Sequence, residues 1–467
     1  MKKSIFAICF TAAFGAAAGT ITEITDDMTA LGDWEITVAA GDSNVVTVAQ
    51  SGSGRIVKKG GGYLVLRKNS TFTGGVELQE GFVMVDPDAD AGTSGTVNCT
   101  ALGTGDVTIL GQRSGYTGYC ELGIVGAGKD DTRIVTITNA IHVTGNTTGT
   151  YPALVLYGKN SVITGKITAD QDFVFWDDYN STKAISSSQY NRYEKVLSCT
   201  FGEIEATGAV GYSGLCRFLI KGTMTTPKLD LAVTRQKRTY DADNPDVNNA
   251  HGAFVFFATN SIGEIINGRR HVYCAAPDVL PGVLFRHTKR TGVTGSVFHL
   301  HNQSPVTGYD QTIGGLVSDP LADGASSGAT AYDWAVTAAS LSKTLTIKGV
   351  EPDEGETTKE LVTCASLNGQ LSILLDAYDG FTQTVSNRMH GISETIHVKK
   401  GAFHVTGTAT MSNLTAIVVD AGASFRFDSP TIRALESLGT LSVEGTFVGT
   451  TANCRKPRSH DLGFLHS

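Results

Sequence analysis

The chain has 467 residues, with 54 glycines, 11 prolines and charged side chains at only 18% of positions. Its 45 acidic residues outnumber its 37 lysines and arginines, so the formal net charge is -8. This mild acidic balance, without a basic face, argues against nucleic acid as a partner. Threonine, serine, valine and glycine are plentiful, and these strand and turn residues favour an all-β protein.

The first 18 residues predict a secretory signal peptide. Lys2 and Lys3 precede an apolar run from Ile5 to Phe14, and small residues follow up to Ala18. A charged start, an apolar core and an Ala-x-Ala end describe a cleaved leader, and the run is too short to span a bilayer. We expect cleavage after Ala18 and a secreted or cell-surface chain. No later stretch approaches the length of a transmembrane helix.

Residues 19–60 hold two short strand patterns, from Trp34 to Val38 and from Val45 to Val48. Both patterns lead into a more regular, glycine-bearing region. A stack of strands leaves unpaired backbone groups at its end, so a solenoid needs a cap there. We therefore expect residues 19–60 to form an N-terminal cap or first coil.

Between Gly61 and Ile109, short apolar strands alternate with glycine-bearing turns about every ten residues. Val76 and Leu78 share one face of an expected strand, because strand side chains alternate with period two. Val83 and Val85 share a face of the next strand for the same reason. Glycine reaches positive φ without steric penalty and stands at the expected turns, at Gly74, Gly75 and Gly81.

In residue order this stretch resembles the autotransporter-associated β-strand repeat. The matching positions are Leu64, Leu66, Asn69, Phe72, Thr73, Gly74, Gly75, Gly81, Ala101, Leu102, Gly103 and Gly105. One departure is that two residues, not one, separate Asn69 from Phe72. The resemblance implies a rung of a right-handed parallel β-helix in a bacterial surface or secreted protein. It implies no catalytic residues.

Similar strands continue beyond this stretch, and their spacing is too tight for helices between parallel strands. We predict an all-β chain that forms an elongated, right-handed parallel β-helix, a solenoid with loop insertions in the middle. Its expected segments are a β-helix over 61–167, a β-helix with longer loops over 168–340, a regular C-terminal β-helix over 341–450 and an irregular tail over 451–467.

The middle region is where a ligand site is expected, because insertions in solenoids emerge on one face that often binds. Aspartates flank an aromatic cluster there, and the candidate ligand-binding residues are Asp170, Asp172, Trp176, Asp177, Asp178 and Tyr179. They could bind calcium or line a sugar-binding groove, with the aromatic rings as stacking platforms. The alternative is that the aspartates only end strands and form turns. No calcium motif is complete, so no cofactor is assigned.

Two cysteine pairs have a spacing close to one coil, which takes roughly twenty residues. Cys99 and Cys120 form the first pair, and Cys199 and Cys216 the second. Since an exported chain can form disulfides, each pair could bridge neighbouring coils. The alternative is that these cysteines are small buried residues.

Motifs for chemistry are sparse. His299 and His301 share a strand face, but two histidines are an incomplete metal site and no metal ligand is assigned. No nucleophile elbow, phosphate-binding loop or zinc-protease motif occurs. We therefore expect a passenger-like display or adhesion protein that contacts glycans or a host or matrix surface, more consistent with a binding protein than an enzyme. The alternative is a polysaccharide lyase or glycoside hydrolase on the same fold.

Overall fold

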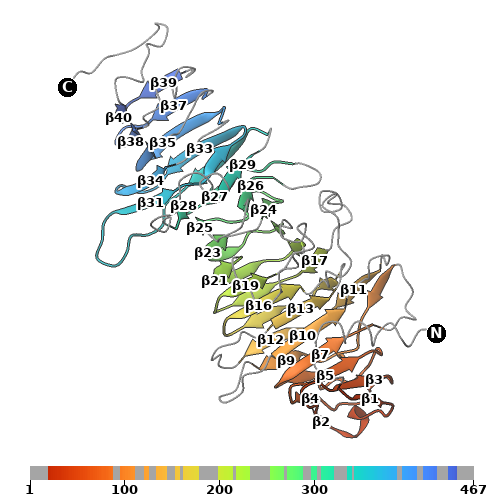
Figure 1. Cartoon of the computed structure of the whole chain (residues 1–467). Coiled ribbons are helices and arrows are strands. Elements are labelled where there is room, and N and C mark those ends of the chain that lie inside the picture. Colours follow the sequence, from red (N-terminus) through yellow and green to blue (C-terminus); the bar gives the residue numbers. More distant parts are fainter. Residues whose placement is uncertain are drawn as a thin grey trace. The chain divides into compact units, whose positions relative to one another are not determined.

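A computed structural model (Figure 1) describes most of the chain, and the structural statements below concern these residues. The described ranges are 19–87, 95–110, 120–125, 133–144, 153–157, 161–177, 198–213, 217–231, 253–267, 271–287, 296–301, 307–319, 334–338, 341–386, 392–406, 414–428 and 440–449. The chain divides into two compact units. The N-terminal unit comprises residues 1–183 and 197–216, and the C-terminal unit comprises residues 184–196 and 217–467.

The N-terminal unit is built from parallel strands that stack in three rows. The first row is β1 (Ile21–Ile24), β3 (Ser43–Val46), β5 (Tyr63–Leu66), β7 (Gly81–Val85), β10 (Cys120–Val125), β13 (Ala153–Tyr157), β16 (Phe173–Asp177) and β19 (Val210–Ser213). The second row is β2 (Trp34–Thr37), β4 (Ile56–Lys59), β6 (Val76–Leu78), β9 (Val107–Leu110), β12 (Ile141–Thr144), β15 (Ile167–Ala169) and β18 (Ile204–Ala206). The third row is β8 (Thr96–Asn98), β11 (Ile134–Ile137), β14 (Ser161–Ile163) and β17 (Ser198–Phe201).

The C-terminal unit has the same construction in four rows. One row is β20 (Arg217–Ile220), β22 (Ala253–Phe256), β24 (His271–Cys274), β26 (Ser296–His299), β29 (Trp334–Thr337) and β32 (Ser366–Asn368). A second row is β21 (Met224–Asp230), β23 (Ser261–Asn267), β25 (Leu284–His287) and β28 (Gly315–Ser318). A third is β27 (Gln311–Ile313), β30 (Lys343–Ile347), β33 (Leu371–Asp376), β35 (Thr395–Lys400), β37 (Ala416–Val419) and β39 (Thr440–Val443). The fourth is β31 (Lys359–Thr363), β34 (Phe381–Val385), β36 (Ala402–Thr406), β38 (Ser424–Asp428) and β40 (Thr446–Gly449).

Successive coils pair in register, which confirms the predicted parallel β-helix. Ile21 lies opposite Ser43, Ser43 opposite Tyr63, and Tyr63 opposite Phe82, so these coils take 19 to 22 residues. Apart from one short 3-10 turn, Thr29–Leu31, the described residues contain no helix. Parallel strands with long connections are therefore stacked here without helical crossovers.

Insertions lengthen some coils without disturbing this register. Gly81 on β7 lies opposite Cys120 on β10, which makes that coil 39 residues long. Longer coils are thus not limited to residues 168–340. Loop length changes the free energy of closing a coil only slowly, so the strands on either side can keep their pairing.

The core is a column of apolar side chains that point into the coils. Val76, Leu78, Val83 and Val85 are buried, as their alternation predicts. Aromatic rings also stack from coil to coil, with Phe425 midway between Phe403 and Phe447 at centroid distances of 6.1 and 5.6 Å. Each fully buried side chain of this kind contributes about 1.5–3 kcal/mol through removal from water.

Three strands of the first row, β3, β5 and β7, are also buried on their outer face. Tyr63 and Phe82 stack with their ring centroids 4.3 Å apart, and Val45, Val65 and Met84 complete this cluster. These strands therefore read as continuous apolar runs instead of alternating ones, as expected of sheets covered on both faces.

The repeat glycines allow close approach between coils. Gly75 and Gly81 both have φ of 77°, which L side chains rarely adopt. Gly74 has no such φ, but a Cβ there would lie 2.6 Å from the backbone nitrogen of Arg55 in the preceding coil. Two of the three predicted turn glycines thus supply positive φ, and the third supplies space.

Amide side chains bond the backbone where the coils turn. Asn139 is buried and donates to the carbonyl oxygens of Gly103 and Gly105, at 3.1 and 2.7 Å. Asn69, in the repeat motif, accepts from the backbone N–H of Thr100 at 2.9 Å. Corner backbone groups have no strand partner, so these amides supply the hydrogen bonds that burial requires.

Candidate functional site

The predicted ligand residues Asp170 and Asp172 act as ties between coils. Asp170 is exposed and accepts a hydrogen bond from the Thr144 hydroxyl at 2.6 Å. Asp172 lies just before β16 and accepts from the backbone N–H of Ala209 at 2.6 Å. Both carboxylates are thus bonded to neighbouring coils, in the way that the turn interpretation of these aspartates describes.

The remaining predicted ligand residues are not brought into a described site. Trp176 and Asp177 form the end of β16, but only their backbone is described. Asp178 and Tyr179 lie outside the described residues. The proposed grouping of aspartates around an aromatic cluster therefore stays a prediction.

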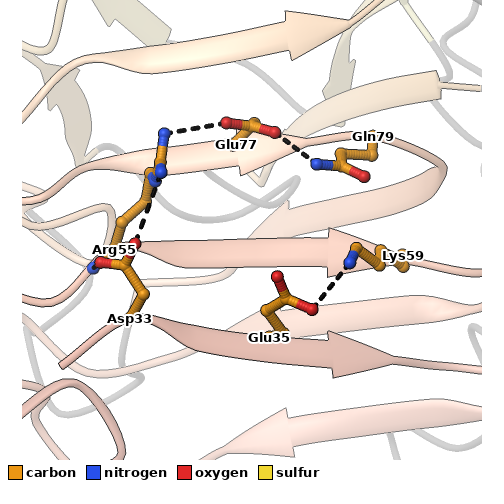
Figure 2. A network of polar contacts seen from close by, with 6 residues as sticks. All are labelled: Asp33, Glu35, Arg55, Lys59, Glu77 and Gln79. Carbon is orange, nitrogen blue, oxygen red and sulfur yellow. Dashed lines mark hydrogen bonds and ion pairs between the residues drawn. The ribbon is translucent and has the colours of Figure 1, made fainter. Parts of the chain in front are cut away.

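Charged side chains on the second row of the N-terminal unit pair across coils, as Figure 2 shows. Arg55 bonds Glu77 at 2.9 Å and Asp33 at 3.4 Å, and Lys59 bonds Glu35 at 2.7 Å. The side chain of Asp33 is 56% exposed and that of Glu35 is 65% exposed, so water screens these pairs and they add little to stability. The charged side chains of this face thus pair with one another in solvent, and we call this series of ion pairs across coils the ion-pair ladder.

The ladder continues over later coils of the same row. His142 bonds the Thr168 hydroxyl through Nδ1 at 2.7 Å and Asp106 through Nε2 at 3.2 Å. Hydroxyl, imidazole and carboxylate are thus aligned, but His142 is 41% exposed and Asp106 is 65% exposed. Nucleophilic catalysis depends on a water-excluded site with donors for a developing oxyanion, and this open sheet face lacks such enclosure.

The cysteines do not form the first expected bridge. Cys99 and Cys120 are buried free thiols, and Cys120 donates to the carbonyl oxygen of Leu78. Cys120 begins β10 in the first row, whereas Cys99 follows β8 in the third row. Burial raises the pKa of the Cys99 thiol to about 11 and that of Cys120 to about 12, which makes both unreactive.

The second cysteine pair is only partly described. Cys199 is a buried free thiol on β17, where it lies opposite Ser161. Cys216 lies outside the described residues, so its pairing remains a prediction.

A groove of about 540 Å³ crosses consecutive coils of the C-terminal unit, over β21, β23 and the turn before β25. Its lining residues are Thr223, Thr225, Thr259, Asn260, Ser261, Ile262, Gly263, Pro281 and Gly282. The four hydroxyl-bearing residues are exposed. None of these described lining residues is charged or titrates near neutral pH, so the groove offers donors and acceptors without an acid, a base or an activated nucleophile.

The side-chain amide of Asn260 bonds backbone groups beside the groove, and both its oxygen and its nitrogen are engaged in these bonds. Its Oδ1 accepts from the backbone N–H of Met224 at 2.8 Å. Its Nδ2 donates to the carbonyl oxygens of Ala258 and Val279, at 2.6 and 2.9 Å. Gly282 also lines the groove, with φ of 74° and no atom within 4 Å of where a Cβ would stand. The exposed hydrogen-bonding groups of the lining are the hydroxyls of Thr223, Thr225, Thr259 and Ser261.

Sequence reasoning placed a contact surface in this region but missed the groove residues. Six of the nine are threonine, serine or glycine, and such residues carry no distinctive spacing. The signal that could have found them is their register, since Thr225 lies opposite Ser261. That register becomes visible only when coil lengths are known.

Comparisons with known proteins identify no relative. No family model, no curated protein and no solved structure matches the chain. In the described part of the chain, no helix is long and apolar enough to cross a membrane. Among the same residues, no group of three or more His, Cys, Asp or Glu side chains is arranged to hold a metal ion.

Proposed function

We propose that the chain is an exported β-helix protein, passenger-like, that works by display and adhesion at a bacterial surface or after secretion. The leader pattern in residues 1–18 and the repeat motif after Gly61 support the export and the surface location. Its partners are glycans or a host or matrix surface. The β-helix supplies a rigid support on which exposed side chains keep fixed positions.

The observation that carries this proposal is the hydroxyl-lined groove over β21 and β23. Threonine and serine hydroxyls both donate and accept hydrogen bonds, as sugar hydroxyls do. Because the described lining is uncharged, a neutral glycan fits it better than an acidic one, whose charge would lose hydration without a partner. Its volume is within the range of small-ligand sites.

A polysaccharide-cleaving activity receives no comparable support. Glycoside hydrolysis needs two carboxyl groups that flank the scissile bond. Asp170 and Asp172 are engaged in bonds between coils, and Glu264 on β23 bonds Arg286 at 2.6 Å. We therefore propose binding without cleavage.

The test is binding of the full exported chain to arrays of glycans and matrix proteins. Thr225→Trp fills the groove with an indole, and we expect it to weaken neutral-glycan binding at least about tenfold, a loss of ~1.4 kcal/mol. Thr37→Trp places the same ring on β2, where Thr37 is also exposed, and should bind like the wild type. Absence of binding on every array, or sugar release from a polysaccharide panel, would contradict the proposal.

A further inference from the structure

A cation–π pair lies beside the hydroxyl-lined groove, on the same two coils. Nζ of Lys221 lies 3.3 Å from the ring centroid of Phe257. Lys221 follows β20 and stands two positions before the groove residue Thr223. Phe257 follows β22 and stands two positions before the groove residue Thr259. Since two residues of extended backbone span no more than about 7 Å, the pair borders the groove.

The two coils keep one register from this pair to the groove. Ile220 lies opposite Phe256 just before the pair, and Thr225 lies opposite Ser261 within the groove. The offset is 36 residues at both places, so the two coils turn the corner between them without an insertion. The cation–π pair and the hydroxyls of the groove are therefore successive steps along the same two coils.

Phe257 is a partly buried side chain on the outer face of the coil. Ala253 and Val255 on β22 form an outer cluster with Tyr273 on β24, and Phe257 packs against this cluster. Lys221 is exposed, and its ammonium group covers a face of the Phe257 ring. The ring is thus held by apolar neighbours on the strand side and covered by a solvent-exposed side chain.

The groove itself offers little apolar surface to a sugar ring. Among its described lining residues, only Ile262 and Pro281 carry apolar side chains, and Ile262 is buried. Binding sites for small molecules combine a few polar groups with apolar and aromatic side chains. The C–H groups of a sugar need such a surface, and an aromatic face supplies it. Phe257 is an aromatic side chain within reach of the hydroxyls.

The Lys221 ammonium can be replaced over the ring. An exposed cation–π contact is weak, and the flexible lysine stem lets the strongly hydrated ammonium move into water. A sugar ring over Phe257 would instead remove apolar surface of both partners from water. Exchange of the ammonium for a sugar is therefore favourable in sign.

We propose that Phe257 is the aromatic subsite of the groove and that Lys221 covers it in the free protein. This inference rests on the proposed function and extends it to the length and orientation of the ligand. A neutral glycan of at least two sugar units lies along the coil, with one unit stacked on Phe257. The next unit lies over the hydroxyls of Thr259 and Ser261. Binding displaces the Lys221 ammonium from the ring.

The first experiment measures the affinity of the full exported chain for maltohexaose, cellohexaose and chitohexaose by calorimetry. Phe257→Leu keeps an apolar side chain without an aromatic face, and we expect it to weaken binding at least about threefold. Lys221→Ala uncovers the ring, and we expect it to strengthen binding about two- to fivefold, the equivalent of an exposed cation–π contact. Lys348→Ala is the matched control and should bind like the wild type, because Lys348 is also exposed but pairs with Asp376 at 2.5 Å.

A second experiment observes Lys221 in the wild-type protein and does not depend on how the variants fold. In protein with ¹³C-labelled lysine, the ring current of Phe257 shifts the ε-methylene signal of Lys221. The signal is assigned by its loss in Lys221→Ala. We expect the bound oligosaccharide to return this signal towards the position of exposed lysines such as Lys348.

The outcomes separate this inference from the function on which it rests. Binding that is weakened by Thr225→Trp but unchanged in Phe257→Leu would overturn the aromatic subsite and leave the groove in place. Weaker binding in Lys221→Ala, or an unmoved Lys221 signal in the complex, would overturn the displacement of Lys221. Absence of binding by every neutral oligosaccharide on the arrays would remove the proposed function, and this inference with it.

Discussion

Lys58 places an ammonium group inside the N-terminal unit. Its side chain is fully buried on β4, and Nζ donates to the carbonyl oxygens of Lys59, Gly60 and Glu80 at 2.9, 2.5 and 3.1 Å. Burial lowers the pKa of Lys58 to about 8, against an opposing influence of Glu80. The lysine thus satisfies three corner carbonyls at the cost of desolvating its charge.

A pH-dependent stability should follow from Lys58. Between about pH 8 and its ordinary pKa of 10.5, the unfolded chain binds the proton more tightly than the folded chain, so stability rises with pH. We expect the wild type to gain up to about 1.4 kcal/mol per pH unit relative to Lys58→Met in this range. Urea unfolding of both proteins at pH 7, 8, 9 and 10 measures the difference. A difference independent of pH would show that Lys58 titrates normally.

At Gly81 the backbone conformation and the neighbouring coil both exclude a side chain. Its φ is 77°, and a Cβ would overlap the carbonyl oxygen of Gly60. Gly41→Ala is a control, because Gly41 also has positive φ, 92°, but no atom lies within 4 Å of its Cβ position. We expect Gly41→Ala to cost about 1–2 kcal/mol from backbone strain alone and Gly81→Ala clearly more. Equal losses in urea unfolding would refute the role of the coil contact.

At the scale of strands and turns, coils are joined by side chains as well as by backbone ladders. Asp172, before β16, accepts from the backbone N–H of Ala209, before β19. The sequence suggested a ligand residue here, and that role stays a prediction, while the contact shows that Asp172 ties successive coils together. Such a tie can be separated from ligand binding by experiment.

Asp172→Ala should lower the unfolding free energy by about 1–2 kcal/mol, because the N–H of Ala209 loses its acceptor. Asp172→Asn retains an acceptor oxygen and should lose less. Both variants should bind glycans like the wild type. Asp170→Ala, which removes only an exposed bond to Thr144, serves as the control and should stay within about 0.5 kcal/mol. Loss of binding in a folded Asp172→Asn protein would return Asp172 to the ligand site.

At the scale of the whole molecule, each unit repeats one construction. Coils without long insertions take 18 to 22 residues, and an insertion such as the one between Gly81 and Cys120 leaves the pairing of the strands unchanged. Stability is then mainly a sum of contacts between neighbouring coils. The proposed binding surface is the groove over β21 and β23, whose hydroxyl-bearing lining residues are exposed.

Several features were readable from local sequence. Alternation at Val76 and Leu78 predicted buried strand faces, and glycines at Gly75 and Gly81 predicted turns with positive φ. Both are local properties, since the period of a strand and the freedom of glycine need no distant partner. The parallel β-helix followed from their repetition.

Other features depended on which residues meet from different coils. Lysine normally indicates a surface position, yet Lys58 is buried because three carbonyls converge on it. His299 and His301 could be placed on one face from spacing alone, but His271 joins them from another coil, 28 residues away from His299. Insertions of variable length hide such pairings in a linear chain.

The sequence by itself determined the class of fold. Strand alternation and turn glycines are local properties of the sequence, and both recur at intervals of one coil. Only the tertiary structure decided which side chains face one another across coils. That choice separates Asp172 as a structural tie from Thr225 as a groove residue, and it gathers the three imidazoles. The physical reason is that register between coils is set by the length of every intervening insertion and by packing around it, not by the residues of any one strand.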